Sequence, residues 1–362
     1  TVSRELLQAL TPEVGAAAGF DISYLRRRAL PSSRTQWHQR SWAAELSGAD
    51  PRVPVRFATW FQAIDVVTAL PWDIRHARAD VYLAIDPHAI PMSRAFATVA
   101  IMYDFIPLLW PEQYLTSRRY MGLPTAIWYA RLRQLKRADW WIAISETTKS
   151  DAVRLAGFDA DRITVAPLAA DPQLFRPIDP QQARAIVAQR FGVTRPYFFF
   201  AGAKDPRKNL STLLDAHDPD IADLVVVGQD APSTAQPGVH WIGKVETADL
   251  PVLYAGAVAF VFPTLYEGFG LPVLEAMGCG TPVVTSALSA IPEVAGDAAL
   301  YCDPRDARAI RDAMRRIAGD DALQHALRRC GLQRAAQFSW SRTAALVLEA
   351  CLAGANYRSR LR

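Results

Sequence analysis

Short apolar runs alternate along most of the chain with longer segments in which apolar and polar positions are mixed. Runs of this length and composition fit strands that are buried on both faces. The longer segments between them are typical of helices, and such alternation is typical of parallel α/β folds. The predicted strands are 81–85, 98–102, 141–144, 163–165, 197–200, 224–227, 240–242, 258–262, 283–285 and 300–301. The predicted helices are 4–10, 145–155, 181–191, 210–217, 250–255, 272–277, 305–318, 323–338 and 341–352.

A proline-rich stretch, 171–180, divides these elements into two halves. We predict an N-terminal domain over 1–172, a second domain over 173–338 and a final helical segment over 339–362. The length of 362 residues agrees with two domains rather than one. Ligands bind open α/β sheets at the carboxyl ends of the strands, so we expect the chemistry at strand ends that face the junction.

Composition and charge narrow the function classes. Hydrophobic residues make up 51% of the chain and charged residues 21%, which excludes a disordered or fibrous protein. The net charge of +4 is too small to indicate nucleic-acid binding. None of the four cysteines forms a C-x-x-C pair, so we expect free thiols in a cytoplasmic protein. No apolar run is long enough to cross a membrane.

The segment 262–286 contains residues that could bind a phosphate and a sugar. It contains Glu267 on a predicted loop, the pair Gly268 and Gly270, and Glu275 one turn into the following helix. Glycines before a helix let backbone amides approach an anion, and the helix dipole favours a phosphate there. Carboxylates accept hydrogen bonds from sugar hydroxyls. A helix cap at Glu267 and a solvated Glu275 are the structural alternative.

A second candidate segment, 201–210, directly follows a predicted strand. Gly202 allows a tight turn, and Arg207 and Lys208 lie just before a helix. The positive end of the helix dipole repels two cations at the N-terminus, but a phosphate bound between the cations would make the arrangement favourable. Taken alone, the segment is equally compatible with solvated loop charges.

Together these segments resemble the retaining GT-B glycosyltransferases of family 4, also called glycosyl transferases group 1. The most specific mark is the E-x7-E pattern at Glu267 and Glu275. The Pro-Arg-Lys-Asn-Leu stretch, the run 291–300 and the closing Phe-Ser-Trp-Ser-Arg are similar too. The resemblance implies two Rossmann-like doubly wound domains facing a central cleft, with acceptor on the first and nucleotide-sugar on the second. It also implies that the C-terminal helix returns to the N-terminal domain, and that a first strand and glycine-rich loop normally precede residue 4.

The resemblance implies roles for residues of the second half. Arg207 and Lys208 would hold the donor diphosphate, Glu267 would contact the donor sugar, and Glu275 would bind the ribose. The implied donor-binding set is Gly202, Lys244, Val245, Glu267, Gly268, Phe269, Gly270, Leu271 and Glu275.

In the first half, the segment 101–108 resembles the family's His-Asp-x-x-Pro motif, with Tyr103 in place of the His. Asp104 is retained, and nearby His88 is a candidate on the acceptor side. The implied catalytic set is Lys208, Arg207, Glu267, Asp104 and Tyr103. A further departure is Ala203, where many relatives have an arginine, and Lys204 is a candidate replacement.

The resemblance implies transfer of a sugar from a nucleotide diphosphate sugar to an acceptor hydroxyl with retention, without a cofactor or metal. It is strongest to bacterial mannosyltransferases of O-antigen and capsule assembly, which favours GDP-mannose as donor. A UDP-sugar donor and a catalytically weak nucleotide-sugar binder are the alternatives. A dinucleotide oxidoreductase is disfavoured because Gly268 and Gly270 do not continue into a G-x-G-x-x-G fingerprint. The Asp-x-Asp pairs at 159–161 and 218–220 are expected to be surface turns rather than metal sites.

The acceptor implied by the resemblance is a glycan or lipid-linked oligosaccharide at the inner face of the membrane. Six basic residues and no acidic one occur over 118–137, together with Tyr120, Trp128 and Tyr129. Such a combination favours contact with an anionic membrane. An ordinary solvated helix with buried aromatics is the alternative.

Overall fold

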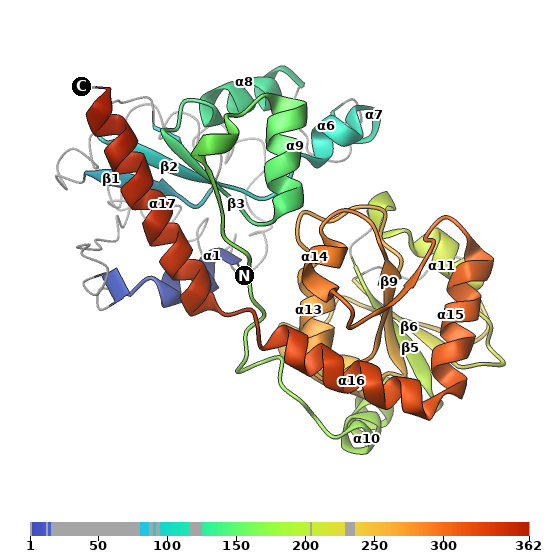
Figure 1. The fold of residues 1–362 in the computed structure, drawn as a ribbon. Coiled ribbons are helices and arrows are strands. Elements are labelled where there is room, and N and C mark those ends of the chain that lie inside the picture. Colours follow the sequence, from blue (N-terminus) through green and yellow to red (C-terminus); the bar gives the residue numbers. More distant parts are fainter. Residues whose placement is uncertain are drawn as a thin grey trace, which may run out of the picture. The chain divides into compact units, whose positions relative to one another are not determined.

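The computed structural model describes residues 2–11, 14–15, 80–86, 90–91, 95–115, 125–202, 205–228 and 236–361. The chain forms two compact units. Unit 1 comprises Thr1–Ala166 and Trp340–Arg362, and unit 2 comprises Pro167–Ser339 (Figure 1). The division at 166/167 lies ahead of the expected boundary at 172/173. The intervening residues 167–172 group with unit 2. Just after them, Phe175 packs edge-on against Tyr254 of unit 2.

In the described part of unit 1, four strands form a parallel sheet in the order β1-β2-β3-β4, so each strand lies beside the one before it in this order. Its strands are β1 (Val81–Ala84), β2 (Ala97–Met102), β3 (Trp140–Ala143) and β4 (Ile163–Val165). Its helices are α1 (Val2–Ala9), α6 (Ile106–Leu109), α7 (Pro111–Tyr114), α8 (Thr125–Leu135), α9 (Glu146–Ala156), the 3-10 turn η1 (Ala160–Arg162) and α17 (Trp340–Arg360). Ser145 caps α9, because its hydroxyl accepts a hydrogen bond from the Thr148 N–H at 2.9 Å.

Helix α17 packs along β2 and β3 of unit 1 (Figure 1). Close approach is possible at Gly354, where a Cβ would lie only 2.7 Å from Val99 Cγ2. An ion pair of 3.2 Å joins Arg358 Nη1 to the buried Asp139 Oδ1. The segment 339–362 is therefore attached to unit 1 both by packing and by charge.

Unit 2 contains one parallel sheet in the order β10-β9-β8-β5-β6-β7. Its strands are β5 (Tyr197–Ala201), β6 (Asp223–Val227), β7 (Val239–Gly243), β8 (Ala259–Phe262), β9 (Val283–Ser286) and β10 (Leu300–Cys302). Its helices are α10 (Pro180–Phe191), η2 (Pro206–Lys208), α11 (Leu210–Ala216), η3 (Thr247–Asp249), α12 (Leu250–Gly256), α13 (Leu271–Gly278), α14 (Ile291–Ala295), α15 (Ala307–Gly319) and α16 (Asp321–Ala335). The central strands β5 and β8 are held by fully buried rings of Phe198, Phe199, Phe260 and Phe262. Because the strands are parallel, the loops that follow β5, β8 and β9 begin at the same edge of the sheet.

The predicted elements are confirmed closely. All ten predicted strands are present, each within one residue at either end, and the described strands are all parallel. The helices α6, α7, α8 and α14 were not among the predicted helices, and α17 extends to Arg360 rather than ending at 352. Its extension lacks an apolar pattern but gains tertiary contacts, since Arg162 lies 4.8 Å from the Tyr357 ring.

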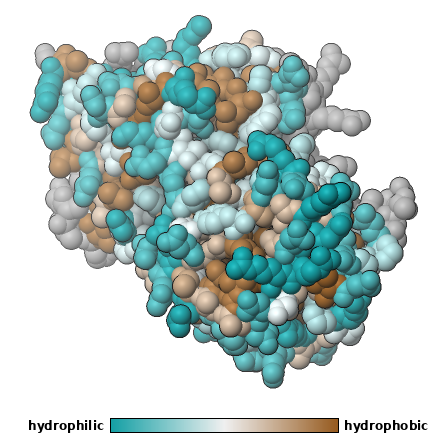
Figure 2. All heavy atoms as spheres, turned by 45° about the vertical axis from the view of Figure 1, so that its right-hand side comes forward, coloured by the Kyte–Doolittle hydropathy of each residue, from teal (hydrophilic) through white to brown (hydrophobic). Residues whose placement is uncertain are grey.

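Among the helices that the structure describes, none is long and apolar enough to cross a membrane. Hydrophilic residues are interspersed with smaller hydrophobic patches on the face that Figure 2 shows.

Candidate active site

Three loops at the carboxyl edge of the unit 2 sheet form the candidate site. The first leads from β5 through Gly202 into η2, the second, 263–270, leads from β8 into α13, and the third, 287–290, leads from β9 into α14. Hydrogen bonds join the first two loops. The Leu265 N–H and the Thr264 hydroxyl both donate to the Arg207 carbonyl oxygen, at 2.8 and 3.1 Å.

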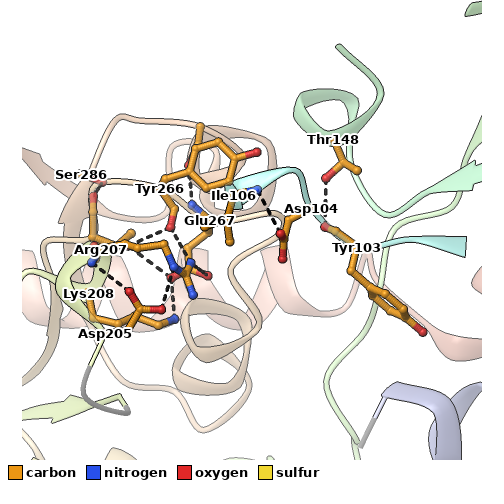
Figure 3. A network of polar contacts seen from close by, with 12 residues as sticks. Tyr103, Asp104, Ile106, Thr148, Asp205, Arg207, Lys208, Tyr266, Glu267 and Ser286 are labelled. Carbon is orange, nitrogen blue, oxygen red and sulfur yellow. Dashed lines mark hydrogen bonds and ion pairs between the residues drawn. The ribbon is translucent and has the colours of Figure 1, made fainter. Parts of the chain in front are cut away.

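The two cations predicted to bind phosphate lie on η2. Asp205 caps this turn, accepting hydrogen bonds from the Arg207 backbone N–H at 3.0 Å and from its Nε at 2.8 Å. Arg207 Nη1 donates to the Tyr266 carbonyl oxygen at 2.9 Å and lies 3.5 Å from Glu267 Oε2. Lys208 Nζ donates to Glu267 Oε1 at 2.5 Å. Figure 3 shows Arg207 and Lys208 pointing toward Glu267.

Asp205, Arg207, Lys208 and Glu267 form a charge quartet that is largely removed from water. Their side chains are 8–14% exposed. Two positive and two negative charges are therefore paired at close range, which offsets the cost of taking each charge out of water. The Glu267 carboxylate thus lies between the two cations that are predicted to bind phosphate.

The loop 263–270 ends in a left-handed turn at the start of α13. Gly270 has a φ of 106° and serves as the N-cap, and no side chain caps the helix. A Cβ at this position would lie 2.8 Å from Ile291 Cδ1. Only glycine fits both the backbone conformation and the space. The preceding Phe269 is buried and packs edge-on against Phe338, with ring centroids 5.9 Å apart.

Glu275 lies one turn into α13, and its carboxylate Oε2 accepts a hydrogen bond from the Tyr254 hydroxyl at 3.1 Å. Burial raises the pKa of the Glu275 carboxyl to about 7, an effect opposed by the Tyr254 hydrogen bond and the Lys208 charge. Burial also raises the pKa of the Tyr254 hydroxyl well above its usual value. Tyr254 therefore stays a hydrogen-bond donor, while Glu275 titrates near neutral pH.

The remaining predicted donor-side residues lie in these loops, at the start of α13 or after β7. A Cβ at Gly202 would lie 3.2 Å from the Phe200 ring and 3.4 Å from Lys208 Cγ, so this glycine lets Lys208 approach β5. Lys244 is exposed just after β7, and Val245 is half-buried. Gly268 is buried within the loop, and Leu271 is the first residue of α13.

In unit 1, Tyr103 and Asp104 follow β2. The Tyr103 hydroxyl donates to the Ile85 carbonyl oxygen at 3.0 Å, and its own carbonyl accepts from the Thr148 hydroxyl at 3.2 Å. Asp104 is exposed, and its Oδ1 accepts from the Ile106 N–H at 3.1 Å (Figure 3). The candidate residues His88, Ala203 and Lys204 lie outside the described residues.

Comparison with known proteins identifies the family. The model described as glycosyl transferases group 1 matches residues 195–320, which include the whole quartet and Glu275. The O-antigen chain mannosyltransferase B of Escherichia coli is 33% identical over 292 residues, covering 74% of this chain and 73% of that protein. The chain belongs to the group 1 glycosyltransferases. It is thus an enzyme of a retaining hexosyltransferase family.

A second relative and a solved structure extend this result. The serotype-specific mannosyltransferase WbdA of Escherichia coli is 28% identical over 272 residues, covering 70% of this chain. The match spans only 33% of that protein's length. Sucrose-phosphate synthase from Thermosynechococcus elongatus superimposes with a TM-score of 0.64 at 22% identity, covering 83% of this chain and 80% of that one. The fold of this group 1 glycosyltransferase is GT-B, with two Rossmann-like units.

Three residues that hold the site of this glycosyltransferase together, Asp205, Tyr254 and Ser289, were not among the predicted site residues. Asp205 could have been found, since an Asp directly before a proline is a common turn signal. Tyr254 and Ser289 carried no local signal, because their partners Glu275 and Glu267 are about twenty residues away in sequence.

The two Asp-x-Asp pairs of the glycosyltransferase lie in turns between helices and strands. Asp159 caps η1 between α9 and β4, and its Oδ1 accepts from the Asp161 N–H. Asp218 similarly accepts from the Asp220 N–H between α11 and β6. Within the described ranges, no three His, Cys, Asp or Glu side chains are grouped so that they could hold a metal ion.

Proposed function

We propose that this glycosyltransferase moves mannose from GDP-mannose to a hydroxyl of a glycan or lipid-linked acceptor in polysaccharide or O-antigen assembly. The observation that carries the proposal is the contact between Lys208 and Glu267, next to the start of α13. It joins a phosphate-binding cation and a sugar-binding carboxylate in one compact group.

The quartet supports a role in stabilising the leaving diphosphate. As the bond to the sugar breaks, negative charge grows on the phosphate oxygen, and donors already fixed in place lower the cost of that charge. Glu267 holds Lys208 in place, and Asp205 holds Arg207. The incoming diphosphate would share Lys208 and Arg207 with these carboxylates, so little reorganisation is needed.

The other donor-side residues have a place in this proposal. The backbone of Phe269, Gly270 and Leu271 would contact the donor sugar and phosphate at the dipole-positive end of α13. Glu275 in its ionised form would accept hydrogen bonds from the ribose hydroxyls. The backbone of Lys244 and Val245 would contact the base. Because cations and a helix N-terminus meet the phosphates, we propose that transfer needs no metal.

The choice of donor rests on the relatives. The O-antigen chain mannosyltransferase B and WbdA are both named as mannosyltransferases, and each aligns with at least 70% of this chain. A UDP-sugar donor is the alternative within the same reaction class.

The exposed face of α8 supports an acceptor at a membrane. Tyr129 is 47% exposed, and Arg133, Lys136 and Arg137 are exposed near the end of the helix. Basic and aromatic side chains in this arrangement favour an anionic lipid surface. We propose that the protein works at the cytoplasmic face of the membrane. Flotation with phosphatidylglycerol vesicles but not with phosphatidylcholine vesicles is the expected result, and equal recovery with both would contradict it.

A thermal-shift panel tests the donor proposal. The protein is heated with GDP-mannose, GDP-fucose, UDP-glucose, UDP-GlcNAc or dTDP-rhamnose, with and without EDTA. A ligand at about 100 times its Kd stabilises the folded state by roughly 2.7 kcal/mol. We expect a shift with GDP-mannose that EDTA does not change and that Glu275→Ala removes. A shift with UDP-glucose alone would support the alternative donor.

A second candidate function, a nucleotide-sugar binder with little transferase activity, is favoured by one observation. The Tyr103 hydroxyl stands where the family motif has a His, and it donates to the Ile85 carbonyl oxygen. GDP-mannose binding without GDP release, in the presence of octyl α-mannoside as acceptor, would support this candidate. Release that depends on the acceptor would exclude it.

A further inference from the structure

Two non-glycine residues in the described part of the chain have a left-handed backbone, and both bond to the loop 263–267. Asn209 has a φ of 58° and Ser289 a φ of 52°. Asn209 Nδ2 donates to the Pro263 carbonyl oxygen at 3.1 Å, and Ser289 Oγ accepts from the Glu267 N–H at 2.8 Å. Left-handed residues other than glycine are strained, and such strain is concentrated at functional sites.

Asn209 joins three segments at once. It is buried, and its Nδ2 also donates to the Pro304 carbonyl oxygen at 2.6 Å, in the loop after β10. Its Oδ1 accepts from the Thr212 hydroxyl at 2.7 Å. Because Asn209 directly follows Lys208, these bonds fix the backbone that carries the lysine side chain.

Ser289 holds Glu267, the other member of the Lys208–Glu267 pair. Its Oγ holds the backbone N–H of Glu267, and the N–H of its neighbour Ala290 points to the Glu267 carbonyl oxygen at 3.5 Å. The loop after β9 thus contacts Glu267 on both sides of its Cα. The base of the same loop has a separate anchor, since Ser286 Oγ donates to the Thr264 carbonyl oxygen at 2.6 Å.

Glycine would adopt either backbone conformation without strain, but it has no side chain to make these bonds. We propose that Asn209 and Ser289 are positioning residues that hold Lys208 and Glu267 against each other for sugar transfer. This inference rests on the proposed function, in which Lys208 and Glu267 contact the donor. The side chains are needed for geometry at the reacting centre rather than for folding.

Steady-state kinetics with GDP-mannose and octyl α-mannoside test the proposal. Ser289→Ala keeps the strained backbone and loses the bond, whereas Ser289→Gly relieves the strain and loses the same bond. Asn209→Gly makes the corresponding change on the other side. We expect kcat for GDP release to fall at least tenfold in all three variants, while KM for GDP-mannose changes less than threefold. Ser289→Gly separates a positioning role from a purely structural one. If Ser289 had only a structural role, the kcat of this variant would equal that of the wild-type protein.

Tyr301→Phe is the matched control. This substitution removes one hydrogen bond in unit 2, which the Tyr301 hydroxyl donates to the Gly296 carbonyl oxygen. It leaves the hydrogen bonds of the loop 263–267 unchanged. Its kcat should stay within twofold of wild type. Ser289 variants within threefold of wild-type kcat would overturn the proposal.

Hydrogen exchange gives a readout that needs no turnover. The Glu267 amide should exchange at least tenfold faster in Ser289→Ala, with the amides of β8 unchanged. An unchanged exchange rate of the Glu267 amide would overturn the positioning role of Ser289, even if kcat falls. Failure of the proposed function is recognised separately. If Glu267→Ala leaves transfer intact, the site assignment fails. If the wild-type protein releases no GDP, the donor proposal fails. The hydrogen-exchange rate of the Glu267 amide then tests the positioning role of Ser289 by itself.

Discussion

Polar side chains follow strands in both units, but they are fixed in different ways. In unit 2 the Lys208–Glu267 contact joins residues 59 positions apart, and both side chains are mostly buried. In unit 1 the Asp104 carboxylate is exposed and accepts from an N–H only two residues away. Long-range, buried pairs resist reorientation, whereas a local turn leaves a side chain accessible.

The difference indicates which side chains are fixed by the protein itself. The quartet of unit 2 pairs its charges internally, so the protein alone holds these four side chains in place. In unit 1 the Asp104 carboxylate is exposed to solvent. Substitutions at the unit 2 site should therefore lower kcat or the free energy of unfolding more than matching substitutions in unit 1.

The largest effect is expected for Lys208→Ala. Loss of one fixed donor to developing negative charge lowers kcat by roughly 10²–10³. The variant also leaves Glu267 with Arg207 as its remaining cationic partner in the quartet. Steady-state GDP release measures the change, and a decrease below threefold would remove Lys208 from the proposed mechanism.

Gly270→Ala tests the left-handed turn before α13. The left-handed backbone and the 2.8 Å approach to Ile291 Cδ1 together should lower the free energy of unfolding by about 3 kcal/mol. Urea denaturation measures the loss. Ile291→Val removes the clashing methyl, so the double variant should recover the steric part only. Equal stability of both variants and wild type would show that the turn tolerates a side chain.

Glu275 should make stability depend on pH. Its pKa is about 7 in the folded protein and about 4.5 when exposed, so the folded state retains a proton that the unfolded state has lost between these values. Stability from this group is complete below pH 4.5 and is lost as the pH rises through 7. Between pH 4.5 and 8, wild type should lose on the order of 2 kcal/mol relative to Glu275→Gln. Parallel pH profiles for the two proteins would contradict a raised pKa.

The smallest effect is expected in unit 1. Asp104→Ala removes a local turn acceptor, which should lower the free energy of unfolding by about 0.5–1 kcal/mol. Asp104→Asn keeps an acceptor oxygen and should retain wild-type stability. Thermal denaturation of the two variants measures the difference. A loss as large as that for Gly270→Ala would mean that Asp104 is held by more than its local turn.

The inner strands β2, β6, β8 and β9 were predictable because their apolar runs are buried throughout. The edge strands β1, β7 and β10 are only half-buried, but their short apolar runs still located them. The E-x7-E pattern likewise located Glu267 and Glu275 on a loop and a helix, as the structure has them. The contact of Lys208 with Glu267 could not be derived, because it depends on the spatial order β8-β5 within the sheet. Helix α14 was missed because its five residues are too short for a periodic pattern.

The placement of α17 has a consequence for how the chain acquires its fold at the ribosome. Unit 2 is continuous in sequence, whereas unit 1 draws its covering helix from residues that are synthesised after unit 2. The faces of β2 and β3 that pack against α17 therefore lack this helix while all of unit 2 is translated. Domains generally fold as units during synthesis, beginning with the N-terminal one, but unit 1 cannot complete its packing before unit 2 has been made. A chain arrested before residue 340 would hold all of unit 2 and an unfinished unit 1.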